Sequence, residues 1–166
     1  MNIDIRHTEP RDSLALQEIH GQTESVMGTL QVPYPTEDAW KKRLENIPDG
    51  SVSLVAEVDG KVVGHADIHF SSKSPRRKHV GEVGMAVHRE WTRKGVGSAL
   101  LAALVDLGER WLDLSRIELA VFVDNQAAIE LYKKHGFEVE GTHKKYAFRD
   151  GEYVDCYCMA RIRENR

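Results

Sequence analysis

The sequence predicts an α/β fold in which a mixed β-sheet carries helices on both faces. One observation is the order of strand-like and helix-like apolar spacings, which follow each other as β-α-α-β-β-β-α-β-α-β-β. The other is a glycine-rich turn, residues 92–98, which joins an apolar strand to a long helical pattern. A chain of 166 residues with 41% hydrophobic side chains is predicted to form one domain, residues 1–166, around a packed core.

The N-terminal part is predicted to contain one short strand and two helices. Residues 2–7 alternate like a strand, and residues 10–20 carry apolar side chains at helical spacing. Two prolines are expected to break regular structure in residues 21–35. Thr36 is a typical N-cap for a second helix over residues 37–46.

The middle of the chain is predicted to form three strands. Asp59-Gly60-Lys61 is a hairpin signal between strands 51–58 and 62–70. Residues 71–78 form a polar loop with four basic residues, which could meet a coenzyme phosphate, meet an acidic partner or simply remain solvated. A third strand, residues 79–87, then leads to the glycine-rich turn.

The C-terminal part is predicted to alternate helices and strands and to end in a hairpin with its turn at Arg149-Asp150-Gly151. Cys156 and Cys158 share one face of the last strand, which is a poor geometry for a disulfide and offers too few ligands for zinc. The expected helices are residues 98–112 and 126–135, and the expected strands are residues 116–123, 137–145 and 152–162.

The glycine-rich turn has the features of a pyrophosphate-binding loop. A turn between a strand and a helix points several backbone N–H groups at one place, with the positive end of the helix behind them. Its glycines allow a ligand to approach the backbone closely, and two basic side chains add positive charge. The candidate binding residues are Arg93, Lys94, Gly95, Val96, Gly97 and Ser98.

Three kinds of nucleotide loop compete for this turn. The chain lacks the G-x-x-x-x-G-K-[ST] string of a Walker loop, and the third glycine of a dinucleotide loop is missing. The third interpretation is a coenzyme A loop. A Gly-x-Gly pair by itself also occurs in tight turns that bind nothing, so a second segment has to decide.

That second segment is residues 121–137, which suggest a strand end, an Asn N-cap, a short helix and a Gly C-cap. Together with the turn at Gly95, it resembles the GNAT family of N-acetyltransferases over nearly the whole chain. Thr92 stands where the family pattern has Gln or Arg, a side chain that a backbone loop does not need. The resemblance implies the GNAT acyl-CoA N-acyltransferase fold, with a mixed, mostly antiparallel central sheet flanked by helices. The matching positions in the second segment are Asn125, Ala128, Tyr132, Gly136 and Phe137.

The resemblance also implies acetyl-CoA as cosubstrate. Its pantetheine arm is expected to pair with the backbone of Met85, Ala86 and Val87, and Asn125 could add a hydrogen bond to its cap role. Tyr132 is the expected partner of the leaving thiolate, since a phenol of reference pKa about 10 can donate to a thiolate of reference pKa about 8.5. Its alternative role is that of a packed aromatic side chain. The histidines are scattered, so no metal is predicted.

A general base is needed because the acceptor amine must lose a proton before it attacks. Glu82 is the first candidate, because it lies on the strand before the turn and Gly84 leaves space on its face. Glu118 is the second candidate, since it interrupts an apolar alternation, and His79 is the third. Each of these side chains could equally be a solvated strand residue.

The acceptor site is implied by the resemblance to lie between residues 26–35 and the final hairpin, residues 143–155. Apolar and aromatic side chains there suit an apolar acceptor better than a polyamine, which would favour clustered carboxylates. The predicted substrate-binding residues are Leu30, Val32, Tyr34, Glu82 and Tyr146.

The acceptor class follows from a finer resemblance. Residues 29–33, 144–147 and 151–155 look like the bacterial L-amino acid N-acetyltransferase branch, which includes enzymes acting on phenylalanine and methionine. This implies a small-molecule amine, a free apolar L-amino acid, whose carboxylate a cation should meet. The nearby cations are Lys144, Lys145 and Arg149.

Two other functions compete with this one, an acetyltransferase for protein N-termini or ribosomal proteins and a non-catalytic acyl-CoA-binding module. The net charge of −3 without a basic face argues against nucleic acid, and no apolar run approaches the roughly 20 residues of a membrane span. The N-terminus lacks the apolar core of a signal peptide, so a cytoplasmic enzyme is expected. Many members of the family are dimers, which makes a homodimer a further expectation.

Overall fold

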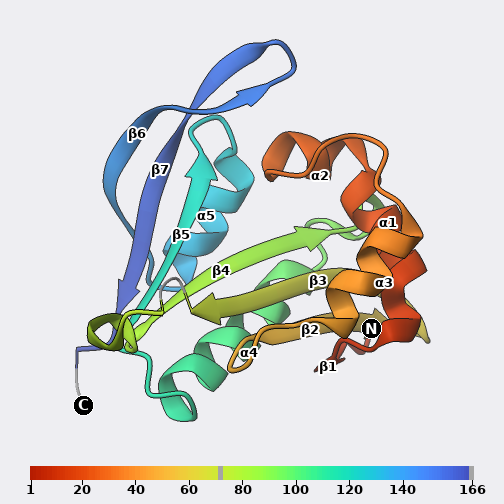
Figure 1. Cartoon of the computed structure of the whole chain (residues 1–166), viewed down its shortest axis with the longest axis horizontal. Helices are drawn as coiled ribbons and strands as arrows, with labels where there is room; N and C mark the ends of the chain where they lie inside the picture. Colours follow the sequence, from red (N-terminus) through yellow and green to blue (C-terminus); the bar gives the residue numbers. More distant parts are fainter. Residues whose placement is uncertain (71–72, 165–166) are drawn as a thin grey trace.

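A single twisted sheet organises the computed structural model, which describes residues 1–70 and 73–164 (Figure 1). Within these residues its seven strands lie in the order β1-β2-β3-β4-β5-β7-β6. Only the β4–β5 pair is parallel among them, so the predicted mixed, mostly antiparallel sheet is confirmed. The strands are β1 (Asp4–His7), β2 (Val52–Val58), β3 (Lys61–Phe70), β4 (Val80–Val87), β5 (Arg116–Phe122), β6 (Glu138–Arg149) and β7 (Glu152–Ile162).

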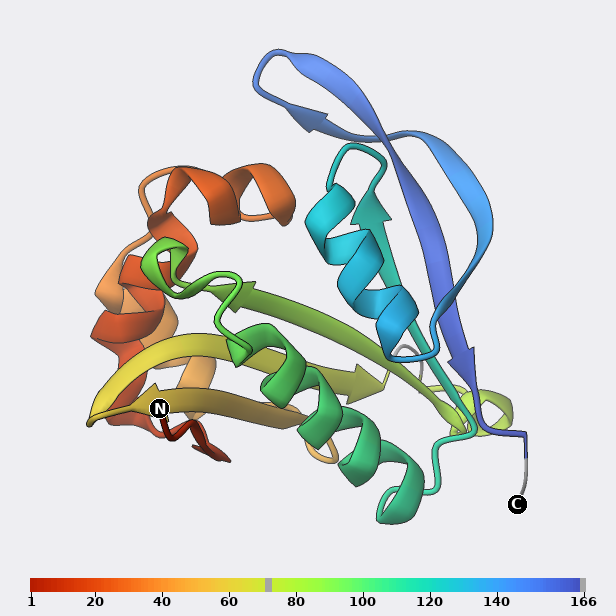
Figure 2. The ribbon, with the colours of Figure 1, turned by 180° about the vertical axis from the view of Figure 1, so that it is seen from behind.

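Helices cover both faces of this sheet, as predicted (Figures 1 and 2). Helices α4 and α5 enclose the larger core cluster, which centres on fully buried leucines of α4. On the other face α1 and α3 enclose a smaller cluster with Trp40 and Ala86. The helices are α1 (Ser13–Gly21), α2 (Thr23–Gly28), α3 (Glu37–Glu45), α4 (Val96–Arg110) and α5 (Gln126–Lys134), and single 3-10 turns are η1 (Pro10–Asp12), η2 (Pro75–Arg77) and η3 (Arg89–Trp91).

Local signals set several element boundaries as expected. The Thr36 hydroxyl accepts a hydrogen bond from the Ala39 N–H at 3.1 Å and starts α3. Asp59 and Gly60 both have positive φ, 49° and 77°, which the tight β2–β3 turn requires. Gly136, with φ 83°, follows the C-cap residue His135 in the left-handed conformation that ends α5.

Three expectations about element extents are wrong. Residues 21–35 contain the short helix α2, because the prolines lie beyond its end and break nothing before residue 29. Helix α4 begins at Val96, two residues before the predicted start, because Gly95 serves as its N-cap. Strand β6 runs on to Arg149 instead of ending at residue 145, since a register shift between His143 and Ala147 absorbs the irregular stretch.

Residues 73–78 of the predicted polar loop lie just before β4, whereas the glycine-rich turn follows the end of β4. Eight strand residues at about 3.3 Å each separate the two by roughly 26 Å. The basic residues of the polar loop are therefore too far away to contact a phosphate bound at the glycine-rich turn. Arg77 instead pairs with Glu118 at 3.3 Å. Ser71 and Ser72 of this predicted loop lie outside the described residues.

Candidate active site

The sheet opens between its two parallel strands. Strands β4 and β5 are in register only from Val80↔Arg116 to Glu82↔Glu118. Beyond Glu82, β4 continues to Val87 and, within residues 1–70 and 73–164, pairs there only with β3, while β5 turns away toward β7 (Figure 1). The β5-facing edge of residues 83–87 thus offers free backbone groups that an amide-containing chain can pair with as an added strand.

Met85, Ala86 and Val87, the residues expected to pair with a pantetheine arm, all lie on this open edge. Ala86 packs its side chain into the smaller core cluster, while Met85 and Val87 pack against the larger one. Their side chains are therefore used for packing on both sheet faces, and only their backbone remains for a ligand. The strand can therefore serve the core through its side chains and a ligand through its backbone.

The glycine-rich turn follows directly at the end of the open edge. Gly95 has φ 86° and forms the left-handed N-cap of α4, a conformation that favours glycine. The first intrahelical bond runs from the Ala99 N–H to the Gly95 carbonyl at 3.0 Å, so the N–H groups before it have no helical partner. They form the anion-binding end of α4.

Gly97 lies where this turn meets α5. A Cβ added there would stand 3.2 Å from Leu131 Cδ2 and 3.7 Å from both Met85 Cε and Val87 Cγ2. Any side chain would therefore enter the space between β4 and α5, next to the open edge. A phosphate-bearing chain that runs from the turn along β4 fits this arrangement.

The other residues of the turn contribute unequally. Val96 is buried in the core, so only its backbone can face a ligand. The Ser98 hydroxyl is bonded to His135 Nε2 at 2.9 Å. Lys94 lies 5.0 Å from the Trp91 ring centroid, and Arg93 holds a left-handed backbone with φ 59°.

Asn125 and Tyr132 come from α5, on the other side of the opening. Asn125 Oδ1 accepts from the Ala128 N–H at 3.3 Å, which confirms the predicted cap. Its Nδ2 lies 3.4 Å from the position of a Cβ at Gly28, so the end of α2 reaches this amide (Figure 2). Tyr132 is 7% exposed, and burial raises its pKa to about 12, which keeps the phenol protonated at neutral pH.

Of the candidate bases, Glu82 is the least constrained. Glu118 stands opposite it in the β4–β5 register but is held by two arginines, Arg116 at 2.8 Å and Arg77 at 3.3 Å. His79 precedes the strand and is exposed. Glu82 itself lies 3.8 Å from His69 Nε2, an approach that the sequence analysis missed.

The predicted acceptor residues are split between two environments. Leu30, Val32 and Tyr34 are 67%, 74% and 94% exposed, so they form an open rim instead of an enclosed pocket. Tyr146 lies near Glu82: burial and the charges of nearby thiols and of Glu82 all raise its pKa. Tyr146 thus lies within range of the Glu82 charge, whereas the 30–34 rim lies in solvent.

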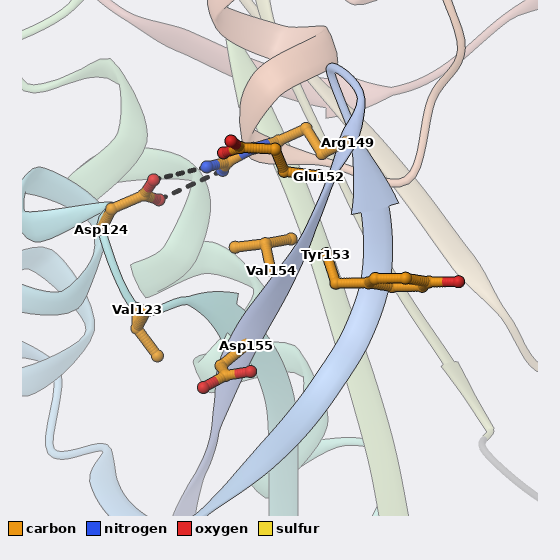
Figure 3. A pocket seen from close by; sticks show the side chains of 7 residues that line it. All are labelled: Val123, Asp124, Arg149, Glu152, Tyr153, Val154 and Asp155. Carbon is orange, nitrogen blue, oxygen red and sulfur yellow. Dashed lines mark hydrogen bonds and ion pairs between the residues drawn. The ribbon is translucent and has the colours of Figure 1, made fainter.

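A cavity of about 330 Å³ lies where the final hairpin meets the β5–α5 loop (Figure 3). Arg149 lies along it, bonded to both carboxylate oxygens of Asp124 and to the Met27 carbonyl at 3.1 Å. One side chain therefore ties β6, α2 and the start of α5 together. The cavity is lined by Val123, Asp124, Arg149, Glu152, Tyr153, Val154 and Asp155.

The three cations considered for a substrate carboxylate all have partners. Arg149 is held by Asp124, Lys144 pairs with Asp155 at 3.3 Å, and Lys145 lies 5.4 Å from the Tyr153 ring centroid. Arg149 is consequently a structural link first. Among the described residues no group of three His, Cys, Asp or Glu side chains could hold a metal ion, and no helix is long and apolar enough to cross a bilayer.

Known proteins share this architecture. The model of the acetyltransferase (GNAT) family matches residues 16–137. The L-amino acid N-acetyltransferase AaaT of Escherichia coli (strain K12) is 51% identical over 161 residues, which cover 97% of this chain and 98% of that protein.

Solved structures give the same match. A phosphinothricin acetyltransferase (Pat) from Sinorhizobium meliloti, in complex with AcCoA, superposes with a TM-score of 0.87 at 26% identity, covering 98% of this chain and 89% of that one. A ribosomal-protein-alanine N-acetyltransferase from Brucella melitensis superposes with a TM-score of 0.85 at 29% identity, covering 95% and 98%.

Proposed function

The chain belongs to the acetyltransferase (GNAT) family and is an acetyl-CoA-dependent N-acetyltransferase, and we propose that its acceptor is the α-amino group of a free apolar L-amino acid. The observation that carries the reaction type is the opening between β4 and β5, which ends at the glycine-rich turn. The likeness to an L-amino acid N-acetyltransferase along nearly the full length supports the acceptor class.

The proposed binding mode for acetyl-CoA uses the backbone. The N–H groups at the start of α4 would hold the pyrophosphate, and the open edge of residues 83–87 would hold the pantetheine arm. Asn125 Nδ2, at the start of α5, would add a hydrogen bond. When bound, acetyl-CoA supplies the acetyl group as a thioester.

The proposed catalytic residues are Glu82, where β4 parts from β5, and Tyr132 on α5. Glu82 would take the proton from the substrate ammonium, directly or through a water molecule, so that the neutral amine can attack. Tyr132 would donate its hydroxyl proton toward the leaving sulfur, and its raised pKa keeps that proton available across the neutral range. Tyr146, within range of the Glu82 charge, would contact the acceptor.

A protein N-terminus is the second candidate acceptor. The exposed rim of Leu30, Val32 and Tyr34 favours it, because an open site admits a chain that extends beyond the reacting residue. The same rim suits a free apolar amino acid only if residues 30–34 close over the bound substrate. The two acceptors therefore differ in whether residues 30–34 must move.

The test is thiol release from acetyl-CoA across a panel of free amino acids, polyamines and short peptides. Release with L-phenylalanine or L-methionine, and none with peptides that carry the same first residue, is the expected result. Release only with peptides would replace the free amino acid by a protein acceptor. Acetyl-CoA binding without release for any amine would indicate a binding module.

We also propose a cytoplasmic site of action and a homodimer. The two cysteines are free thiols, Cys156 buried and Cys158 partly buried, a state that reducing compartments maintain. The exposed apolar rim offers surface that a second copy could cover. Sedimentation at micromolar concentration measures the oligomeric state, and a monomer there would remove the dimer from the proposal.

A further inference from the structure

Next to Glu82 lies a pair of titratable side chains that the mechanism above does not use. Asp67 and His69 are two residues apart on β3, so both point to the sheet face that carries Glu82. His69 Nδ1 lies 3.4 Å from Asp67 Oδ1, and His69 Nε2 lies 3.8 Å from Glu82 Oε2. The imidazole thus stands between two carboxylates, one on each ring nitrogen.

The sheet register sets the positions of Asp67, His69 and Glu82, which together form a row of titratable side chains. His69 is opposite Glu82 and Asp67 is opposite Gly84. A Cβ on Gly84 would lie 3.3 Å from Asp67 Oδ1, so glycine is what leaves room for the Asp67 carboxylate. Asp67 then orients the ring, as carboxylates do for histidines in other enzymes, and turns Nε2 toward Glu82.

The surroundings of this row are mixed in charge. The hydrogen bond from His69 to Asp67 is the main reason why the pKa of His69 is raised, and the charge of Glu82 adds to it, while burial and Arg43 of α3 act in the opposite direction. Burial would raise the pKa of Asp67, but His69, His65 and Arg43 together lower it.

Further groups approach Glu82 from the other strands. Glu118 stands opposite it on β5. Tyr146 of β6 and Cys158 of β7 lie close enough for the Glu82 charge to raise their pKa values. These three neighbours are a carboxyl group, a phenol and a thiol, so His69 is the one nitrogen base among the groups named here.

We propose that His69, oriented by Asp67, is a positioning residue that receives from Glu82 the proton removed from the substrate ammonium and passes it to solvent. The proposal rests on the proposed function of Glu82. The amine N–H bond breaks and leaves its electron pair on nitrogen, and an O–H bond forms on Glu82. That O–H bond then breaks as an N–H bond forms at His69 Nε2, and water takes the proton from the imidazolium.

Two properties suit His69 for this step. Imidazole has a reference pKa of about 6.5, closer to neutral pH than other side chains, and efficient proton transfer favours a group whose pKa is near the operating pH. The His69 side chain is 47% exposed, so it can release a proton directly to water. A water molecule or a small side-chain rotation closes the 3.8 Å gap to Glu82.

The first test is the pH dependence of kcat for His69→Gln and Asp67→Asn. In the wild-type enzyme we expect kcat to rise with pH through an apparent pKa above 6.5. His69→Gln should remove this limb and lower kcat at pH 7 by about tenfold, a modest share of what acid–base groups contribute. Asp67→Asn should move the limb to lower pH. His7→Gln, an exposed histidine on β1, is the matched control and should leave the profile unchanged.

The second test is an NMR titration of the His69 ring in the wild type, Asp67→Asn and Glu82→Gln, which needs no turnover. We expect the His69 pKa to fall in both variants. An active wild type whose pH profile survives His69→Gln overturns the relay and leaves the proposed function intact. A wild type that acetylates no amine overturns the proposed function, and a His69 pKa that neither variant moves overturns the coupling by itself.

Discussion

The Tyr132 side chain combines packing with a retained proton. Its ring lies 5.8 Å from that of Phe137, centroid to centroid, inside the larger core cluster. The same burial raises the pKa of its hydroxyl to about 12, because the phenolate would lose its hydration. The burial that packs the ring is therefore also what keeps the hydroxyl protonated.

Tyr132→Phe should separate the two roles. The ring stays and the hydroxyl goes, so we expect kcat to fall by roughly 10- to 100-fold while the acetyl-CoA dissociation constant changes less than twofold. Steady-state kinetics with calorimetric binding measure both quantities. Tyr157→Phe, at a partly buried tyrosine on β7 that packs against the core, is the control. Unchanged kcat would remove the hydroxyl from the mechanism.

Gly97 tests the placement of the pyrophosphate. Gly97→Trp should abolish acetyl-CoA binding, but its bulk would also press on Leu131, which a mere Cβ approaches to 3.2 Å. Gly97→Ala is the milder variant, and we expect it to weaken binding about tenfold, or about 1.4 kcal/mol, with an unchanged circular dichroism spectrum. Gly141→Ala, where a Cβ meets nothing within 4 Å, should bind like the wild type. If Gly97→Ala bound acetyl-CoA as tightly as Gly141→Ala does, the proposed placement of the pyrophosphate would be contradicted.

At the scale of elements, the hairpin of β6 and β7 depends on one arginine for its position. Arg149 bonds to Asp124 through both guanidinium arms, bonds to the Met27 carbonyl, and lies 5.1 Å from the Phe122 ring centroid. Its charge also lowers the pKa of Asp124. Because α2 leads into the exposed rim at residues 30–34, this contact connects the hairpin to the acceptor side.

Arg149→Lys should loosen this connection, because an ammonium cannot reproduce the bidentate contact. We expect the KM for the amine to rise several-fold, the acetyl-CoA affinity to stay the same, and proteolysis of the hairpin to become faster. Arg110→Lys, in an exposed i,i+4 pair on α4, controls for loss of a surface ion pair. A raised acetyl-CoA dissociation constant with an unchanged amine KM would show that the Arg149 contact supports the acetyl-CoA side of the site instead of the acceptor side.

At the scale of the whole molecule, a row of buried polar groups crosses the smaller core cluster. His65 bonds to Ser53 at 2.8 Å and to His20 at 2.9 Å, and His20 stacks on Trp40. Burial lowers the pKa of His20 to about 3 and that of His65 to about 4. Both rings are therefore neutral in the folded protein at pH values where the unfolded chain already binds protons.

The stability of the protein should consequently fall in mild acid. The unfolded histidines take up protons below about pH 6.5, whereas the folded ones do so only near pH 4 and 3, so the unfolding free energy should drop progressively between these limits. We expect a loss on the order of a few kcal/mol, measurable by urea unfolding at pH 7.5 and pH 4.5. His7→Gln should keep this dependence and His20→Gln should reduce it. An unfolding free energy that does not change between pH 7.5 and pH 4.5 would contradict the burial of His20 and His65 as neutral rings.

The order of the strands, the mixed sheet, the helix caps and the glycine-rich turn all followed from the sequence, because apolar periodicity and turn chemistry are local properties. The GNAT resemblance added the cosubstrate for the same reason, since its motif residues lie within two short segments. The predicted order of elements lacked only helix α2 among the α-helices and strands of the described residues. Element extents were less predictable: α2 and the end of β6 depend on packing and on a register shift.

The tertiary structure alone decided which side chains meet. His69 and Glu82 are 13 residues apart, and Arg149 and Met27 are 122 apart, so their contacts depend on strand register and hairpin position, which no local pattern specifies. The alternation His65, Asp67, His69 was visible on a predicted strand, but its partner across the register was not. The parting of β4 and β5 likewise exists only in the assembled sheet, because beyond Glu82 β4 stays paired with β3 while β5 stays paired with β7.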